Sequence, residues 1–372
     1  MSEHLLDEIV LGELDRVWAS WPASEYWQQA VAATSAEHHY AGEDVAKQLA
    51  LVADRCSRVS LNACAVAEGM EAAGRPITNR PGRVMHLVAS SVPGLAVESI
   101  CHTLALGATV VIKPSRRETV LDMWLQHLHA VASPLCERIE LSTVAVPENI
   151  DAAVVFGTDE TVAFVQTQLD EARNGSTPIA GYGNRTGIGI IDSAALPSAQ
   201  SWLPSLSDDI ATFLQRGCMS PRHLIVVGAL PQAMQTEYKE ALAAALQTAW
   251  NTHVAGPPTE ELDVHARSMH DEQILDALFD AAPSEDTLRY ESLEVELHWA
   301  IDDQHARTLL DQFATTLQTA VLVSESPARF NQLVQLASSA GCTRTCPPGY
   351  AHAPAADWPH DGIGWFTPLL RT

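Results

Sequence analysis

The first part of the chain carries apolar residues at helical spacing. Ile9, Val10 and Leu14 fall on one face of a helix, and residues 45–69 are rich in alanine and leucine at similar intervals. This pattern predicts helices up to about residue 80. The segment contains no catalytic constellation, so we interpret it as a helical cap over the domain that follows.

From residue 83 the pattern changes to short apolar runs separated by helical segments. Residues 84–89 and 108–112 predict buried strands, and residues 95–106 between them predict a helix. A strand–helix–strand unit of this kind is typical of a parallel α/β sheet, whose ligands bind outside the carboxyl ends of the strands. Further helices are expected at 119–131 and 160–173, and further strands at 139–146 and 152–156.

A second run of alternating strands and helices predicts a separate lobe. Its expected strands are 188–191, 224–227, 291–300 and 320–323, and its expected helices are 208–215, 233–250, 259–281, 304–317 and 328–339. We therefore expect an α/β protein in three parts. Residues 1–215 form the cap and a parallel-sheet domain, and residues 216–345 form a second α/β domain. Residues 346–372 form an irregular tail that packs back on the first domain or contributes to an oligomer contact.

Glycines cluster in the stretch Gly-Tyr-Gly-Asn-Arg-Thr-Gly-Ile-Gly, which begins at Gly181. The stretch resembles a dinucleotide-binding fingerprint superficially, but the glycine spacing differs and an apolar strand follows instead of a helix. We expect these glycines to let the backbone pass close to a ligand or to another strand.

The composition is that of a globular protein. The chain has 372 residues, 47% of them hydrophobic, which is enough for a large core in two or three domains. No run of about 18 apolar residues is present, which disfavours a membrane span, and the first residues lack the basic region of a signal peptide. The seven cysteines are an odd number spread over a long chain, a usage typical of free thiols in the cytoplasm.

A net charge of −24 excludes some partners. Nucleic acids and anionic membrane surfaces require clustered cations, so we expect neither. Any anionic ligand must be held by local positive charge. Only three lysines occur, and one of them, Lys113, ends an apolar predicted strand and is followed by Arg116 and Arg117.

Gly157 and Thr158 follow another predicted strand and precede a helix. Such a corner can present backbone N–H groups to a phosphate. The neighbouring Asp159 and Glu160 oppose an anion, and an ordinary N-capped helix is an equally good interpretation.

Cys218 occupies a corner between a predicted helix and a predicted strand. It lies between Gly217 and a Met-Ser-Pro turn, shortly before the apolar run 224–227. Such a corner allows the thiol and a backbone N–H to point the same way, as an acyl-transfer nucleophile requires. The alternative is a small, inert core cysteine, which is the more common situation for a cysteine considered on its own.

The stretch from residue 341 onward contains five potential zinc ligands, Cys342, Cys346, His352 and the pair His360-Asp361. Neither their spacing nor their number matches a zinc-binding pattern. We therefore assign no metal ligands from the sequence.

Four stretches together resemble the acyl-CoA reductases of the LuxC family, within the aldehyde dehydrogenase superfamily. They are Ser-Val-Pro-Gly-Leu at 91–95 with Val-Ile-Lys-Pro-Ser at 111–115, Gly-Tyr-Gly-Asn-Arg at 181–185, Gln-Arg-Gly-Cys-Met-Ser-Pro at 215–221, and Trp-Pro-His-Asp-Gly at 358–362 with Pro-Leu-Leu-Arg at 368–371. The resemblance covers roughly residues 84–228 and 341–372, in matching order and spacing. It implies a nicotinamide-cofactor-binding domain with a parallel sheet, a second α/β catalytic domain, and reduction of an acyl thioester to an aldehyde.

The resemblance also implies roles for individual residues. Cys218 is the expected nucleophile that carries the acyl group, and Lys113 and Ser115 are expected to hold the adenosine end of the cofactor. Arg116 occupies a position at which many NAD-preferring relatives carry a glutamate that binds the ribose hydroxyls. Because an arginine pairs with a 2′-phosphate instead, we expect NADPH as the cofactor.

Three further cofactor contacts follow from the resemblance. Gly157 and Thr158 match the turn on the pyrophosphate side. Glu291 matches the glutamate that holds the nicotinamide ribose, although a solvated strand-edge carboxylate is at least as good an interpretation of that residue.

Two positions depart from the family pattern. Gly181 stands where hydrolytic aldehyde dehydrogenases carry a general-base glutamate, so water should not be activated against an acyl-enzyme. Ser91 stands where an asparagine usually helps bind the oxyanion, and its hydroxyl is the expected substitute donor. Loss of one oxyanion donor can cost about 10²–10³ in rate.

We therefore expect an enzyme that reduces an acyl-CoA or acyl-carrier-protein thioester to an aldehyde with NADPH, through an acyl-Cys218 intermediate. Three alternatives stay open: CoA-acylating oxidation of an aldehyde at the same site, a cofactor-free cysteine acyltransferase or thioesterase, and a non-catalytic scaffold subunit that docks an acyl donor protein. A homo-oligomer, or a complex with an acyl-donor protein, is expected.

Overall fold

The computed structural model describes residues 6–70, 80–173, 175–256 and 287–370. Two compact units divide the chain. Unit 1 contains residues 1–38, 42–183 and 355–372, and unit 2 contains residues 39–41 and 184–354. The expected helix at 259–281 lies outside the described residues.

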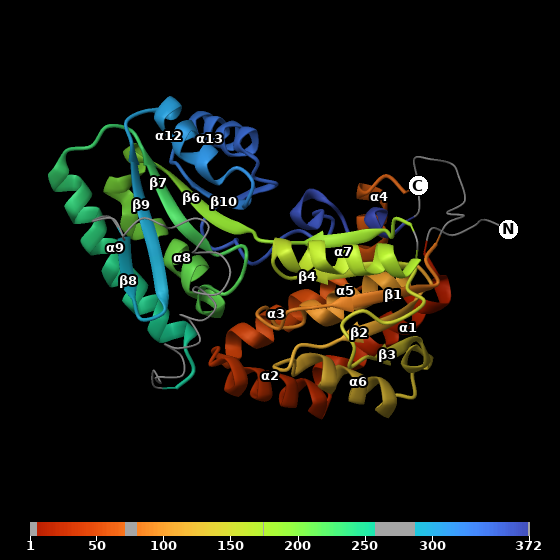
Figure 1. Cartoon of the computed structure of the whole chain (residues 1–372). Helices are drawn as coiled ribbons and strands as arrows, with labels where there is room; N and C mark the ends of the chain where they lie inside the picture. The colour runs from red at the N-terminus through yellow and green to blue at the C-terminus, as the bar shows by residue number, and fades with distance from the viewer. Residues whose placement is uncertain (1–5, 71–79, 174, 257–286, 371–372) are drawn as a thin grey trace. The chain divides into compact units, whose positions relative to one another are not determined.

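The described residues of unit 1 form a five-stranded parallel sheet with the order β3-β2-β1-β4-β5 (Figure 1). The strands are β1 (Arg83–Leu87), β2 (Thr109–Lys113), β3 (Ile139–Leu141), β4 (Ala152–Phe156) and β5 (Ile179–Tyr182). The order reverses between β1 and β4, which is the position at which such sheets usually bind ligands. The expected strand at 139–146 is shorter than predicted, and β5, which runs into the glycine cluster, was not predicted.

Unit 1 is rich in helices, as the sequence predicted. They are α1 (Glu8–Ser20), α2 (Glu25–His38), α3 (Gly42–Arg55), α4 (Arg58–Ala67), α5 (Leu95–Ala105), α6 (Val120–Ala130) and α7 (Asp159–Arg173). The α5 helix is buried at every position from Ala96 to Ala105. Gly94 precedes it with a φ of 78°, and a Cβ there would lie 3.1 Å from side-chain atoms of Leu49 and Val52 on α3. A glycine at this position therefore lets α3 pack directly on the start of α5.

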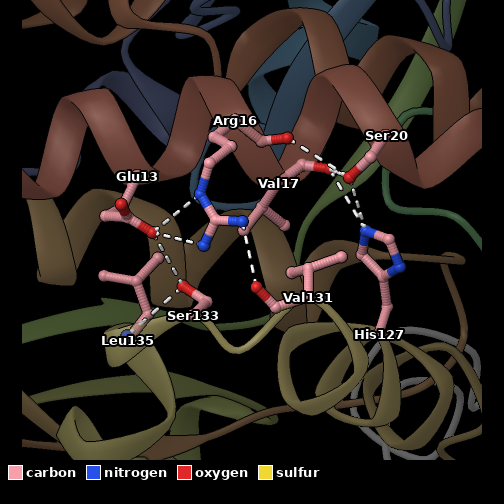
Figure 2. Close-up of polar contacts among 8 residues, drawn as sticks. All are labelled: Glu13, Arg16, Val17, Ser20, His127, Val131, Ser133 and Leu135. Atoms are coloured by element: carbon pink, nitrogen blue, oxygen red, sulfur yellow. Dashed lines mark hydrogen bonds and ion pairs between the residues drawn. The ribbon is translucent and has the colours of Figure 1, made fainter.

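Polar contacts join the amino-terminal α1 to the end of α6, as Figure 2 shows. Arg16 donates to the backbone oxygen of Val131 at 3.0 Å and pairs with Glu13 at 2.7 Å. One turn further along α1, the Ser20 hydroxyl lies 3.0 Å from the His127 ring, whose pKa is lowered mainly by burial. The amino-terminal helices are thus bonded to the helices that flank the sheet.

The end of the chain also belongs to unit 1. The Tyr182 hydroxyl, at the end of β5, donates to the backbone oxygen of Gly364 at 2.6 Å. The Tyr182 ring stacks on Phe156 at 4.5 Å and meets the edge of His360 at 4.7 Å between centroids. Residues 355–370 therefore pack on unit 1.

The Glu68 carboxylate, just after α4, binds this tail. It accepts hydrogen bonds from the backbone N–H groups of Trp365 at 2.6 Å, Phe366 at 3.0 Å and Thr367 at 2.8 Å, and from the Thr367 hydroxyl at 3.0 Å. Gly364 precedes these donors with a φ of 84°, and a Cβ there would lie 2.5 Å from the Glu68 carboxyl carbon. One carboxylate thereby collects the donors of three successive residues.

The described residues of unit 2 form a six-stranded sheet with the order β11-β10-β6-β7-β9-β8. Its strands are β6 (Thr186–Asp192), β7 (Pro221–Val227), β8 (Thr287–Tyr290), β9 (Leu293–Ala300), β10 (Leu317–Val323) and β11 (Arg344–Cys346). The edge strand β8 is antiparallel to β9, and the other pairs are parallel. The central strands β6, β7 and β10 are buried almost throughout, as expected for a sheet covered on both faces.

Helices cover both faces of this second sheet. The α12 helix (Asp303–Leu310) and α13 helix (Pro327–Ala340) pack on one face, where Leu310 and Leu333 join a core with Ile188 and Ile225 (Figure 1). On α8 (Ala199–Ala211) and α9 (Gln232–His253), aromatic side chains pack toward β9. The Tyr238 ring of α9 lies 6.2 Å from Trp202 of α8 and 6.2 Å from Trp299 of β9.

The division of the chain differs from the expected domain boundary at residue 215. Unit 2 already begins at Asn184, because β6 pairs with both β7 and β10 in the second sheet. The second expected boundary, at residue 345, also shifts, since residues 346–354 remain in unit 2. Strand pairing, which the local sequence pattern does not reveal, sets both positions.

Some expected elements of unit 2 have different limits. The strand expected at 291–300 begins only at Leu293, because a two-residue turn at Glu291 joins it to β8. The helix expected at 208–215 is instead the end of α8 followed by an irregular segment, and the helix expected at 304–317 ends before β10. No helix in the described part of the chain is both long and apolar enough to cross a membrane.

We expect Glu68→Ala to destabilise the protein by about 2–4 kcal/mol. The substitution leaves several tail N–H groups without their charged acceptor, and hydrogen bonds to charged groups contribute about 1.5–3 kcal/mol each. Chemical denaturation followed by tryptophan fluorescence measures the loss.

Glu43→Ala is the matched control, because Glu43 forms an exposed pair with Lys47 that contributes at most about 1 kcal/mol. Equal stability of the two variants would show that Glu68 does not hold the tail.

Candidate active site

Cys218 lies on a strained loop between α8 and β7. Three successive residues before it, Phe213, Leu214 and Gln215, have φ values of 54°, 52° and 60°. Non-glycine residues rarely adopt this left-handed conformation, and it persists only where the surroundings enforce it. The Phe213 ring supplies part of that enforcement, because it packs against Tyr40 at 5.3 Å and His352 at 5.5 Å between centroids.

Hydrogen bonds of the Gln215 side chain also hold this backbone conformation. Its amide nitrogen donates to the backbone oxygens of Pro221 at 3.0 Å and Glu294 at 2.9 Å, and its amide oxygen accepts from the Glu294 N–H at 2.9 Å. Gln215 is 1% exposed, so water does not replace these bonds. The side chain thus joins the loop before Cys218 to the starts of β7 and β9.

The loop then turns tightly past β6. The Ser220 N–H donates to the Gly217 oxygen at 3.1 Å, which closes a turn around Cys218 and Met219. A Cβ at Gly187 on β6 would lie 2.4 Å from the Met219 oxygen and 2.7 Å from the Ser220 oxygen. The expectation that these glycines let another backbone pass closely is confirmed at Gly187, whose neighbour is the turn that carries Cys218.

Cys218 differs from most of the other cysteines in its surroundings. It is half-buried, and its sulfur accepts a hydrogen bond from the Gln318 amide nitrogen at 3.4 Å. Five cysteines are buried, and burial raises the pKa of Cys342 and of Cys346 to about 12. Burial also raises the pKa of Cys136, the other half-buried thiol. Of the two accessible thiols, Cys218 is the one on a constrained loop with an amide donor.

Residues from the tail support the same loop. His352 Nε2 lies 2.8 Å from the Asp209 backbone oxygen and 3.4 Å from the Ser220 hydroxyl. The Asp209 carboxylate accepts from the N–H groups of Gly349 at 2.7 Å and Ala351 at 3.0 Å. Burial raises the pKa of Asp209 to about 6, and these two hydrogen bonds oppose that shift. His352, considered as a zinc ligand in the sequence, serves as a packing partner of the Cys218 loop.

In unit 1, the expected cofactor residues lie at the carboxyl ends of the strands. Lys113 ends β2, and its Nζ donates to the Pro114 oxygen at 3.4 Å without forming an ion pair in the described part of the chain. Ser115 follows, and its hydroxyl lies 3.0 Å from that of Ser90 in the loop after β1. The structure therefore brings the loop that contains Ser91 together with the loop that follows Lys113.

The two arginines after Lys113 have different environments. Arg117 pairs with Glu37 of α2 at 2.6 Å. Arg116 is exposed and, among the residues the structure describes, forms no ion pair. The accessible cation at this corner is therefore Arg116.

Gly157 and Thr158 follow β4, with Gly157 exposed. The Thr158 hydroxyl accepts from the Thr161 N–H at 3.1 Å and so caps the start of α7. A Cβ at Gly157 would lie 3.0 Å from the Thr161 side chain. The turn thus combines an ordinary helix cap with an exposed glycine. An N-capped helix and a turn that faces a phosphate, the two interpretations of this stretch, are therefore compatible.

Gly181 lies on β5, where α7 crosses the strand. A Cβ there would lie 2.5 Å from a methyl carbon of Val162. Any larger residue, including a glutamate, requires the Val162 side chain or α7 to shift. The packing of α7 on β5 thus accounts for the absence of a side chain at Gly181.

Glu291 lies in unit 2, at the exposed turn of the β8–β9 hairpin, with a φ of 52°. It is therefore neither within a strand nor at a strand edge. The expected oxyanion donor Ser91 and the expected cofactor residues other than Glu291 belong to unit 1, and Cys218 belongs to unit 2.

Sequence reasoning missed four residues around Cys218: Gln215, Gln318, His352 and Gly187. Gln215 and Gly187 stood within motifs already noted. Their partners include residues distant in the chain, Glu294 for Gln215 and Met219 for Gly187. Only the structure shows that their side chains or backbone meet.

The two units define an α/β protein with the fold of aldehyde dehydrogenases. Solved structures with this fold include aldehyde dehydrogenase 21 from Physcomitrella patens, with a TM-score of 0.67 and 12% identity over 94% of this chain and 79% of that one. A benzaldehyde dehydrogenase from Corynebacterium glutamicum gives a TM-score of 0.62 and 13% identity over 92% and 83%. A succinic semialdehyde dehydrogenase from Streptococcus pyogenes gives 0.63 and 10% over 92% and 82%.

The family model of the acyl-CoA reductases (LuxC) matches residues 4–372. The chain therefore belongs to this family and is an oxidoreductase that reduces acyl-CoA to aldehyde. A search of curated protein sequences finds no match. The family and fold expected from the four motifs are both confirmed.

We expect Gly187→Ala to reduce kcat/KM by about 10²-fold, because the new methyl group displaces the turn that carries Cys218, and a displacement of about 1 Å can cost that much. Steady-state kinetics with an acyl-CoA substrate measures the effect, and circular dichroism reports whether the variant is folded.

Gly175→Ala is the control, since a Cβ at Gly175 meets no atom within 4 Å. A folded Gly187→Ala enzyme with the activity of this control would rule out a positional requirement for the turn.

Proposed function

We propose that this protein reduces acyl thioesters of CoA or of an acyl-carrier protein to aldehydes, with NADPH as reductant and a covalent acyl-Cys218 intermediate. The observation that carries the proposal is the half-buried Cys218 thiol. It lies on a loop fixed by Gln215 and accepts a hydrogen bond from Gln318. Membership in the acyl-CoA reductase family supplies the reaction class.

Cys218 performs the first chemical step. Its thiolate attacks the thioester carbonyl carbon, and the CoA or carrier thiolate leaves. The leaving thiol needs little acid catalysis, because its pKa is close to the usual cysteine value of about 8.5. The amide N–H of Gln318, 3.4 Å from the sulfur, supports the thiolate before attack. The Cys218 N–H and the Ser91 hydroxyl are the proposed donors to the oxyanion.

Residues at the carboxyl ends of β1, β2 and β4 would hold the cofactor. Lys113 and Ser115 would bind its adenosine end, and Arg116 its 2′-phosphate. The fit is supported by a half-buried lysine without an ion pair in the described residues, beside an exposed arginine. When bound, the nicotinamide supplies the hydride that reduces the acyl group.

Three weaker cofactor contacts complete the proposal. The exposed Gly157 turn and Thr158 would face the pyrophosphate. The Thr158 hydroxyl already caps α7, so its contribution would come from backbone N–H. Glu291 would contact the nicotinamide ribose. Its place in an exposed hairpin turn makes it the least supported member of the set.

Gly181 makes hydrolysis of the acyl-cysteine inefficient. No side chain at this position can activate water, and the packing of Val162 keeps the position small. The acyl group therefore remains available for reduction or for transfer to a thiol. The same site also accommodates the reverse reaction, CoA-acylating oxidation of an aldehyde, and metabolite ratios would set the direction.

Two other functions give different experimental results. A cofactor-free acyltransferase or thioesterase uses Cys218 but not NADPH or Arg116. A non-catalytic scaffold requires neither the Cys218 thiol nor NADPH. The cytoplasm remains the expected location, and a homo-oligomer or a complex with an acyl-donor protein the expected assembly.

We expect Cys218→Ala to abolish NADPH consumption with every acyl-CoA and acyl-carrier-protein donor that the unmodified enzyme accepts. Without the sulfur, no acyl-enzyme forms. Absorbance at 340 nm, a property of NADPH, follows the reaction, and intact-protein mass spectrometry detects the acyl adduct when the cofactor is omitted.

Cys136→Ala is the matched control, because Cys136 is also half-buried. Reduction that persists in Cys218→Ala would remove this thiol from the mechanism, and acyl adducts without any NADPH consumption would instead identify an acyltransferase.

We expect Arg116→Ala to raise KM for NADPH by about 10- to 100-fold and to change KM for NADH little. The lost interaction is a charge-assisted pair, which contributes about 1.5–3 kcal/mol. Initial rates with both cofactors test this, with Lys47→Ala as a control that removes an exposed cation on α3. Equal effects on the two cofactors would contradict a 2′-phosphate contact.

A further inference from the structure

Two strands of unit 2 place three metal-ligating side chains together. His223 lies on β7, and Glu296 and His298 lie two residues apart on β9. Residues two apart on a strand point to the same face. His223 and Glu296 are register partners in the parallel β7–β9 pair, so their side chains are neighbours across it. The three residues form the one cluster of this kind among the described residues.

Each residue contributes a single atom to the cluster. His223 Nδ1 lies 3.4 Å from Glu296 Oε2 and 3.4 Å from His298 Nε2, and His298 Nε2 lies 3.7 Å from the same Glu296 oxygen. The three atoms thus form a nearly regular triangle.

The triangle has the size of one face of a zinc coordination tetrahedron. Zinc lies about 2.0–2.2 Å from histidine nitrogen and carboxylate oxygen. In a tetrahedron with such bonds, neighbouring ligand atoms are about 3.3–3.6 Å apart. Two observed edges, both 3.4 Å, fall within that spacing, and the third, 3.7 Å, exceeds it by 0.1 Å.

Hydrogen bonding among the three groups explains the distances less well. Hydrogen bonds of N–H to oxygen are about 2.7–3.2 Å long, and charge-assisted ones are shorter still. The two edges to the Glu296 oxygen exceed this range, and the contact between the two histidine rings is a long hydrogen bond of 3.4 Å. In addition, one ring N–H directed to one acceptor cannot serve two edges of a triangle equally.

The surroundings suit a metal ion that keeps one open position. The His223 side chain is 5% exposed, and its ring is fixed by stacking on Phe313 at 4.2 Å between centroids. The side chains of Glu296 and His298 are 18% and 19% exposed. An ion can therefore enter from the Glu296 and His298 side, and a water molecule can occupy the fourth position there.

We propose that His223 Nδ1, Glu296 Oε2 and His298 Nε2 bind one Zn²⁺ ion, with water as the fourth ligand. Two histidines and one glutamate are a ligand set that zinc accepts. The ion would join β7 to β9, the same two strands that the Gln215 side chain joins at their beginnings. It would therefore restrict the movement of β7 and β9, to which Gln215 attaches the Cys218 loop. The site does not depend on the reaction assigned to Cys218.

Metal-binding measurements on the full chain test this proposal. The protein, purified without a histidine tag and stripped with a chelator, is titrated with Zn²⁺ by calorimetry and with Co²⁺ by visible spectroscopy. We expect one metal ion per chain, a Co²⁺ spectrum with tetrahedral d–d bands and no thiolate charge-transfer band, and a higher Tm with zinc.

Variants assign the site. Glu296→Gln and His298→Ala should each weaken zinc binding by at least about 100-fold, since loss of even an outer partner of a metal ligand costs about 10–100-fold. His129→Ala, which removes an exposed histidine of α6, should bind zinc like the unmodified protein.

Three results would overturn the proposal. They are absence of stoichiometric zinc binding by the unmodified protein, unchanged binding in a folded Glu296→Gln or His298→Ala variant, and a thiolate-to-cobalt band. If His298→Ala does not fold by circular dichroism, the Glu296→Gln variant and the Co²⁺ spectrum of the unmodified protein decide.

Discussion

The amide of Gln215 is the interaction on which the arrangement around Cys218 depends. It bonds to backbone groups of both β7 and β9, as a neighbouring strand would. These bonds offset the conformational cost of Gln215 and the two residues before it, which all have left-handed backbone conformations. Cys218 therefore lies on a rigid loop, which Gly187 and His352 contact from two other directions.

The expected cofactor residues of unit 1 are positioned in a simpler way. In unit 1, a parallel sheet directs the ends of its strands to one edge, and the loops after β1 and β2 meet there through Ser90 and Ser115. Backbone topology alone brings these residues together. The two groups of expected site residues are thus positioned in different ways, by a sheet edge in unit 1 and by a fixed loop in unit 2.

This difference decides what could be predicted from sequence. The strand β4 and the helix α7 were predicted almost to the residue, since their signals are local. The end of β2 at Lys113 was equally visible. One partner of Gln215, by contrast, is Glu294, 79 residues away in the chain. The two residues that lie beside His223, Glu296 and His298, are on another strand. Glu291 was assigned to a strand because the pattern does not distinguish a hairpin turn from the strand that follows it.

The bonds of Glu68 to residues 365–367 also constrain how the protein is made. Unit 1 contains residues from both ends of the described chain, whereas unit 2 is an insertion within it. During synthesis the amino-terminal part of a chain emerges first, and domains generally fold as units. The contacts of residues 355–370 with the rest of unit 1 therefore form only after all of unit 2 has been synthesised. Until that segment is made, Phe156 of β4 and Tyr182 of β5 lack the ring contacts that His360 and Trp365 give them in the finished fold.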